Sequence, residues 1–120
     1  MLPVKRSKFA ILGGGSWGTT TASVISRHCD AILWARDGQI VDEINQAHTN
    51  HRYLGDAALN AKLAATTDIG AAVNQAEAVL IAVPSSHFRE VLASALSHLP
   101  MGIPLISLSK GLEKGSRMRM

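Results

Sequence analysis

Short apolar runs alternate with amphipathic stretches along most of this chain of 120 residues. Within each run the apolar residues are continuous, a pattern typical of strands that are covered on both faces of a parallel sheet. Glycines end the first run and Pro84 ends the fourth, because neither residue type favours a continuing paired strand. The runs predict five strands, of which the third is the weakest: 8–12, 31–34, 63–66, 78–83 and 104–108.

Between these runs, apolar residues recur at the spacing of an amphipathic helix in four stretches: 16–28, 38–47, 69–76 and 86–98. Thr67 or Asp68 is placed to cap the third helix, and Ser85 or Ser86 the fourth. The alternation of strands and helices predicts one domain over residues 1–120, an open, doubly wound parallel α/β sheet. The helical side chains expected to face its core are Val24, Ile25, Ile40, Val41, Ile44, Ala47, Phe88, Val91, Leu92, Ala95, Leu96 and Leu99.

The composition is that of a small globular protein, with 47% apolar and 18% charged residues. It excludes a disordered tail, a collagenous repeat and a disulfide scaffold. The single cysteine, Cys29, has no partner for an intramolecular disulfide, which favours a reducing compartment. We expect Cys29 to be a small residue beside the core rather than a nucleophile.

The formal net charge of +3 comes from the two ends of the chain, because residues 9–109 hold more acidic than basic side chains. A nucleic-acid-binding face would need a basic stripe on a folded element and aromatic platforms for the bases. The apolar runs are also too short for a signal peptide or a membrane-spanning helix. We therefore expect a cytoplasmic protein that binds neither nucleic acid nor membrane.

The clearest functional motif is the run Gly-Gly-Gly-Ser-Trp-Gly at 13–18, a G-x-G-x-x-G between a predicted strand and a predicted helix. In this context Gly13 permits a tight turn, Gly15 lets a pyrophosphate approach the backbone, and Gly18 lets the helix pack on the strand. The helix N-terminus then offers unpaired N–H groups to the phosphates. Thr19 stands where a P-loop requires lysine, so that motif is excluded. The alternative is a glycine-rich turn without a ligand.

The end of the second predicted strand bears on which nucleotide binds. An NAD-selective site places an acidic residue there for the ribose hydroxyls. Here the first polar residue is Arg36, which can clamp a 2′-phosphate or stack on adenine. This favours NADP(H), while Asp37 leaves NAD(H) open. A surface arginine without a ligand is the alternative.

Four loops follow predicted strands and are expected to meet at one crevice: 13–18, 35–36, 83–85 and 109–111. Lys110 precedes a glycine and is placed to hold an anionic group or to polarise a carbonyl. A solvated lysine is the alternative. His48 and His51 lie three residues apart, but no further carboxylate or cysteine completes a ligand set. We expect no metal site.

Taken together, these motifs resemble the bacterial-type NAD(P)-dependent glycerol-3-phosphate dehydrogenases over residues 8–115. The most specific pieces are Gly-Ser-Trp-Gly-Thr at 15–19 and Lys-Gly-Leu-Glu at 110–113. The resemblance implies a Rossmann-like cofactor domain and the reversible reduction of dihydroxyacetone phosphate to sn-glycerol 3-phosphate by hydride transfer, a step that feeds glycerophospholipid synthesis. The residues expected at the cofactor are Gly13, Gly15, Ser16, Trp17, Gly18, Arg36, Tyr53, Pro84 and Lys110, and Lys110 is also expected to contact substrate.

The sequence departs from the family pattern in three ways. Gly14 replaces a common alanine, which we expect to be harmless, and Gly55 stands where proline often occurs. Family members also continue into a helical C-terminal domain that supplies the proton-transferring lysine, and we expect that domain to be absent from this chain of 120 residues. We therefore expect a cofactor-binding part with no catalytic residue of its own, inactive alone, whose uncovered apolar surface favours a homodimer or aggregation. The alternatives are a non-catalytic dinucleotide-binding module and a related hydroxyacid or 3-hydroxyacyl-CoA dehydrogenase.

Overall fold

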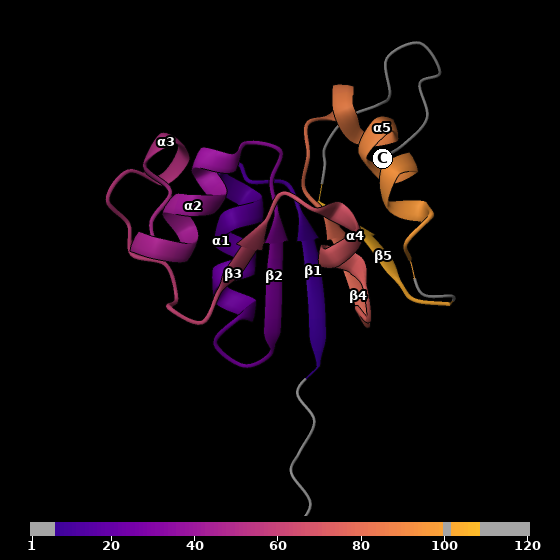
Figure 1. Ribbon diagram of the computed structural model, residues 1–120, viewed down its shortest axis with the longest axis horizontal. Helices are drawn as coiled ribbons and strands as arrows, with labels where there is room; N and C mark the ends of the chain where they lie inside the picture. Colours follow the sequence, from indigo (N-terminus) through magenta and orange to yellow (C-terminus); the bar gives the residue numbers. More distant parts are fainter. Residues whose placement is uncertain (1–6, 100–101, 109–120) are drawn as a thin grey trace, which may run out of the picture.

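The described residues of the computed structural model are 7–99 and 102–108, and they form one five-stranded sheet. All four strand pairings are parallel, in the order β3-β2-β1-β4-β5 (Figure 1). This confirms the predicted doubly wound sheet. The strands are β1 (Lys8–Leu12), β2 (Asp30–Trp34), β3 (Ala64–Thr66), β4 (Ala78–Ile81) and β5 (Leu105–Ser107).

Within the described residues five helices connect the strands, one more than the sequence pattern predicts. The additional helix, α3, spans only four residues, too few for an apolar period to be visible. Within the described ranges, none of the helices is both long enough and apolar enough to cross a membrane. The helices are α1 (Ser16–Ile25), α2 (Gly38–Ala47), α3 (His51–Leu54), α4 (Ile69–Val73) and α5 (Ser85–Leu96).

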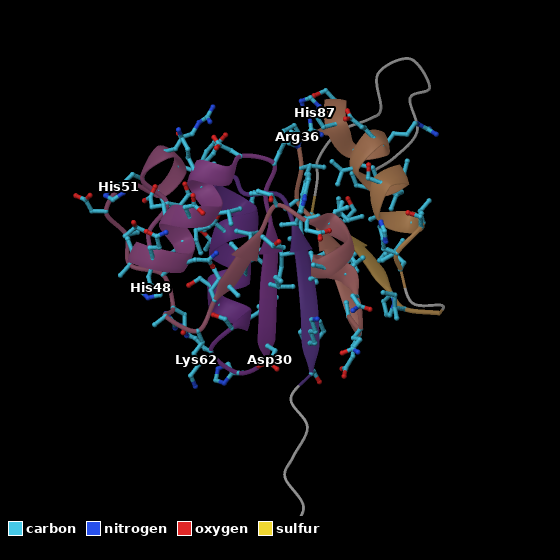
Figure 2. All side chains as sticks on the ribbon, viewed as in Figure 1. Asp30, Arg36, His48, His51, Lys62 and His87 are labelled. Carbon is cyan, nitrogen blue, oxygen red and sulfur yellow. The ribbon has the colours of Figure 1, made fainter. Side chains whose placement is uncertain are left out.

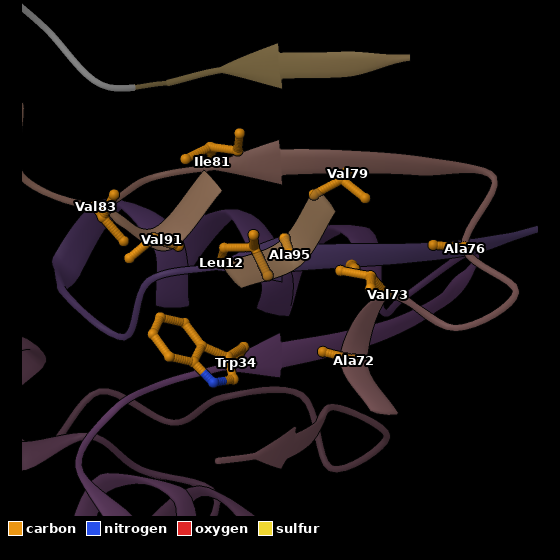
Figure 3. Packing of buried hydrophobic residues seen from close by; sticks show 11 residues of the cluster. Leu12, Trp34, Ala72, Val73, Ala76, Val79, Ile81, Val83, Val91 and Ala95 are labelled. Carbon is orange, nitrogen blue, oxygen red and sulfur yellow. The ribbon is translucent and has the colours of Figure 1, made fainter. Parts of the chain in front are cut away.

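The two faces of the sheet are covered by different helices. On one face, buried residues of α1 and α2 pack against Ile11, Leu33 and Leu80. On the other face, Leu12, Trp34, Val79 and Ile81 of the strands pack against residues of α4 and α5 (Figure 3). Because β1, β2 and β4 contribute to both clusters, their continuous apolar sequences are explained by burial on both sides.

Three helical residues expected in the core are exposed instead: Val24, Ala47 and Leu96. The buried face of α1 consists of small or polar residues, namely Gly18, Thr19, Ala22 and Ser23. This face lets the helix approach the sheet closely and turns Val24, which is 53% exposed, toward solvent. Leu96 follows the fully buried Ala95 by one residue, about 100° around the helix, and is 55% exposed.

The helix boundaries show which caps form. Asp68 caps α4 by accepting a hydrogen bond from the Ala71 N–H at 3.2 Å. Of the two predicted caps, Thr67 and Asp68, the structure therefore uses Asp68. The prediction of a serine cap for α5 is wrong. That helix begins at Ser85, so its N-cap position belongs to Pro84, which has no side-chain acceptor. Helix α1 ends at Ile25 rather than at residue 28, because the Arg27 and His28 N–H groups bond three residues back and form a turn.

Candidate functional site

A cleft of about 720 Å³ opens at the carboxyl ends of β1, β2 and β4. It lies where the strand order reverses: the chain runs outward from β1 through β2 and β3, then crosses back to β4 on the other side of β1. Such a reversal separates the two connecting loops and creates a crevice for a ligand. The sequence-predicted residues that line it are Gly13, Gly15, Ser16, Trp17, Arg36, Tyr53 and Pro84.

The glycine loop is tightly packed at Gly13 and Gly18. Gly13 has φ +127°, and a Cβ there would lie 2.5 Å from the Ala82 carbonyl oxygen. A Cβ on Gly18 would overlap the Gly13 carbonyl oxygen, so only glycine lets α1 begin this close to β1. Gly18 is therefore buried behind the loop and does not line the cleft.

Gly15 has a different environment, because a Cβ built on it meets no atom within 4 Å. Its φ of −77° and ψ of −169° are extended and open to any residue. The space beside Gly15 faces the first N–H groups of α1, whose first turn contains no acidic side chain. Backbone donors, a positive helix terminus and free space are the features that a phosphate-binding site requires.

Gly14 is more constrained than the sequence suggested. A Cβ at this position would lie 2.7 Å from the Ala35 Cβ, a separation that requires one of the two segments to shift. Glycine fits here as it stands, and it is alanine that would require the shift. The contact joins the glycine loop to the residue that follows β2, and sequence spacing does not reveal it.

Asn50 is a site residue whose role the sequence did not show. Its side chain is fully buried, and its Nδ2 donates to the Gly14 carbonyl oxygen at 2.9 Å and to the Thr19 hydroxyl at 3.0 Å. Asn50 also precedes α3, which carries Tyr53 into the cleft. It thereby fixes the glycine loop and the Tyr53 segment relative to each other. His87, on α5, is a second cleft residue that the pattern did not indicate.

The charged side chains at the cleft are paired. The Arg36 Nη2 lies 3.3 Å from the Glu90 Oε1 of α5, and both side chains are exposed. Asp37 caps α2 by accepting from the Gln39 N–H at 2.8 Å, and its second oxygen lies 3.4 Å from the Arg52 Nη1. The Arg52 guanidinium also lies over the Tyr53 ring, 5.3 Å from its centroid. Lys110, predicted at the same rim, lies outside the described residues.

His48 and His51 do not join a common cluster, and the described ranges contain no group of three or more side chains arranged to hold a metal ion. His51 instead lies between two carboxylates. Its Nδ1 is 2.5 Å from the Glu43 Oε2 and its Nε2 is 3.0 Å from the Asp56 Oδ1. These contacts, the Glu43 hydrogen bond foremost, raise the pKa of His51 above its ordinary value.

This arrangement predicts that stability falls as the pH rises. A histidine with a raised pKa stabilises the folded chain fully below its unfolded pKa of 6.5, and this contribution is lost as the pH rises through the folded value. We expect the difference in unfolding free energy between the wild-type chain and His51→Gln to shrink from about pH 6 to about pH 8. Urea unfolding over that range measures it, and a difference independent of pH would contradict the ion pair.

The comparisons with known proteins agree with this geometry. A family model described as "NAD-dependent glycerol-3-phosphate dehydrogenase N-terminus" matches residues 8–120. The chain belongs to this family. A glycerol-3-phosphate dehydrogenase of the NAD(P)+ type from Sphingopyxis alaskensis is 48% identical over 96% of this chain and 34% of its own length. One from Mycobacterium avium is 46% identical over 98% of this chain and 35% of its own length. The resemblance inferred from the motifs is confirmed.

Solved structures share the fold. The glycerol-3-phosphate dehydrogenase from Coxiella burnetii superposes with a TM-score of 0.85 at 36% identity, over 96% of this chain and 35% of that one. The Plasmodium falciparum enzyme gives a TM-score of 0.86 at 27% identity, over 97% and 36% of the two chains. This chain spans about a third of the length of the curated relatives that it matches.

Proposed function

We propose that residues 1–120 form the dinucleotide-binding part of a glycerol-3-phosphate dehydrogenase. Such an enzyme interconverts dihydroxyacetone phosphate and sn-glycerol 3-phosphate, and the nicotinamide cofactor supplies the hydride. The observation that carries the proposal is the free space at Gly15, bounded by the start of α1 at the point where the strand order reverses. Membership of the family supports the reaction and, with it, a role in glycerophospholipid synthesis.

Within this function the residues of the cleft have separate tasks. The backbone at Gly13 and Gly15 and the Ser16 residue would hold the pyrophosphate, while Gly18 allows α1 to begin beside it. Trp17 and Tyr53 would provide aromatic surfaces at the mouth, where they are 62% and 45% exposed. The remaining proposed contacts come from the loops that follow β2, β4 and β5, namely Arg36, Pro84 and Lys110. Lys110 would also meet the substrate, and we propose no catalytic acid or base in this chain.

The binding proposal is tested by titrating the chain with NADPH and NADH while following tryptophan fluorescence. Trp17 is exposed at the cleft, so a bound dinucleotide is expected to change its emission. Trp17→Phe is the matched control, because the buried Trp34 also emits. Saturable binding that releases heat in parallel calorimetry supports the proposal. A folded chain that binds neither dinucleotide in either measurement would contradict it.

The reaction is tested in a chimaera in which this chain replaces the matching residues of the Sphingopyxis alaskensis relative. NADPH oxidation that depends on dihydroxyacetone phosphate is expected. A chimaera that binds NADPH but oxidises it only with a 2-oxoacid or a 3-oxoacyl-CoA would favour a neighbouring dehydrogenase. One that binds NADPH and oxidises it with none of these substrates would favour the non-catalytic module.

For the cofactor we propose NADP(H) in preference to NAD(H). Arg36 lines the cleft with a guanidinium that can bind a 2′-phosphate through two hydrogen bonds. Asp37, the acidic residue that could serve a ribose in NAD(H), is already engaged by the Gln39 N–H and by Arg52. Its role as the cap of α2 makes it a poor ribose acceptor.

Arg36→Ala is therefore expected to weaken NADPH binding by about 10- to 100-fold, the effect of one charge-assisted bidentate contact, and NADH binding by much less. Dissociation constants for the two dinucleotides measure this difference. Arg27→Ala is the control, because Arg27 is exposed in the turn after α1, at the amino ends of the strands. Equal losses for both dinucleotides would assign Arg36 to stacking on adenine instead.

We also propose that the chain self-associates. The supporting observation is exposed apolar surface on α5 and β5, formed by Leu96, Leu105 and Ile106. Sizing of the chain over a range of concentrations measures self-association, and a monomer at every concentration would contradict the proposal.

For the cellular location we propose the cytoplasm, which the single cysteine, Cys29, supports.

A further inference from the structure

Arg36 is held from across the cleft. Its guanidinium follows β2, whereas its partner Glu90 lies 54 residues later in α5. Figure 2 shows Arg36 beside the beginning of α5, where His87 is labelled, and His87 lines the same cleft. Glu90 follows His87 by three residues, so both side chains lie on the same side of the helix. The cleft-facing side of α5 therefore presents a carboxylate to the arginine.

We infer that Glu90 is a specificity-determining residue that weakens the binding of 2′-phosphorylated dinucleotides by competing for Arg36. This inference rests on the proposed function, because it assumes that a dinucleotide occupies the cleft. A 2′-phosphate that approaches Arg36 must replace the Glu90 carboxylate or share the guanidinium with it. Replacement costs the attraction between Arg36 and Glu90, and sharing divides the guanidinium between two acceptors, so both oppose binding. A dinucleotide without the 2′-phosphate leaves this ion pair in place.

The ion pair itself contributes little to the fold. The side chains of Arg36 and Glu90 are 59% and 66% exposed, and ion pairs this exposed add little to stability. Within residues 7–99 and 102–108, Arg36 is the one side chain that pairs with the Glu90 carboxylate. The other acid at the cleft mouth, Asp37, is different because it also caps α2. Changing Glu90 therefore removes only this exposed pair, at little cost in stability.

Glu90→Gln tests the inference because it removes the charge and keeps the shape of the side chain. We expect NADPH to bind about two- to fivefold more tightly to this variant, the effect of one exposed ion pair that no longer has to be broken. NADH affinity is expected to stay within about twofold. Raising the salt concentration should reduce the gain, because salt screens exposed charges. In the double variant with Arg36→Ala the gain should disappear, since no guanidinium remains to be released.

Glu77→Gln is the matched control. It makes the same change of charge, but Glu77 immediately precedes β4, at the amino ends of the strands and opposite the cleft. Both variants are expected to unfold at the same urea concentration as the wild-type chain. A gain in NADPH affinity of equal size in Glu77→Gln would assign the effect to net charge and overturn the role of Glu90.

A second probe separates this inference from the proposed function. 2′,5′-ADP carries the 2′-phosphate without the nicotinamide, and 5′-AMP is the same molecule without the 2′-phosphate. Tighter binding of 2′,5′-ADP by Glu90→Gln, with 5′-AMP binding unchanged, supports the inference. If neither whole dinucleotide binds in that case, the proposed function alone is contradicted. Equal effects on the two probes, or no binding of 2′,5′-ADP by any variant, would overturn the role of Glu90.

Discussion

Gly18→Ala is expected to lower the free energy of unfolding by about 3 kcal/mol, because a new Cβ in a packed site must displace its neighbours. At this position the Cβ would overlap the Gly13 carbonyl oxygen and lie 3.3 Å from the Ala82 Cβ. The first of these neighbours is backbone and cannot rotate away. Helix α1 must then move off β1, which opens the core on that face of the sheet.

Urea unfolding of the two chains measures this loss. Thr20→Ala is the matched control, because it places alanine two residues later in the same helix, at an exposed position. That change is expected to be neutral or slightly stabilising, since alanine has the higher helix propensity. A loss below about 1 kcal/mol for Gly18→Ala would mean that the start of α1 adapts without cost, contrary to the close packing of the loop.

Gly15→Ala is expected to cost no more than about 1 kcal/mol of stability, the loss from placing alanine at the N-cap of α1, and to weaken dinucleotide binding at least about tenfold. A methyl group on Gly15 meets no protein atom within 4 Å, and the backbone there is extended, so the folded chain accepts it without strain. The same methyl group would occupy the space proposed for the pyrophosphate and separate it from the N–H groups of α1. Losing a charge-assisted hydrogen bond costs about 1.5–3 kcal/mol, which corresponds to tenfold or more in affinity.

Calorimetric titration with NADPH and thermal unfolding of the same samples measure both parts of this prediction. Gly38→Ala is the control: it adds a methyl group at the start of α2, where the nearest atom is the Thr67 Cγ2 at 4.0 Å, and Gly38 does not line the cleft. A Gly15→Ala chain that binds NADPH as tightly as the wild type would remove the observation on which the proposed function stands. Gly18→Ala and Gly15→Ala together distinguish a glycine that the packing of the loop requires from one that leaves room for a ligand.

The motif residues could be placed from the sequence because the chemistry involved is local. The run at 13–18 follows a strand and opens a helix, and Arg36 is the first polar residue after the next strand. In a parallel sheet the carboxyl ends of all strands lie at one edge, so knowing the strands is enough to bring such residues together. The same reasoning could not place Val24 or Leu96, because helix rotation depends on which residues the sheet accepts.

The sequence by itself determined the order of the five strands, four of the helices and most of the cleft residues on the loops, because apolar runs and glycine spacing act over a few neighbouring residues. Its motifs also carried the resemblance to the family. The tertiary structure alone decided the contacts between distant segments. Asn50 reaches Gly14 over 36 residues, and Glu90 faces Arg36 over 54. Gly14 likewise meets Ala35 only because β1 and β2 end side by side. Such contacts depend on how helices and strands pack in space, and no local pattern in the chain records that packing.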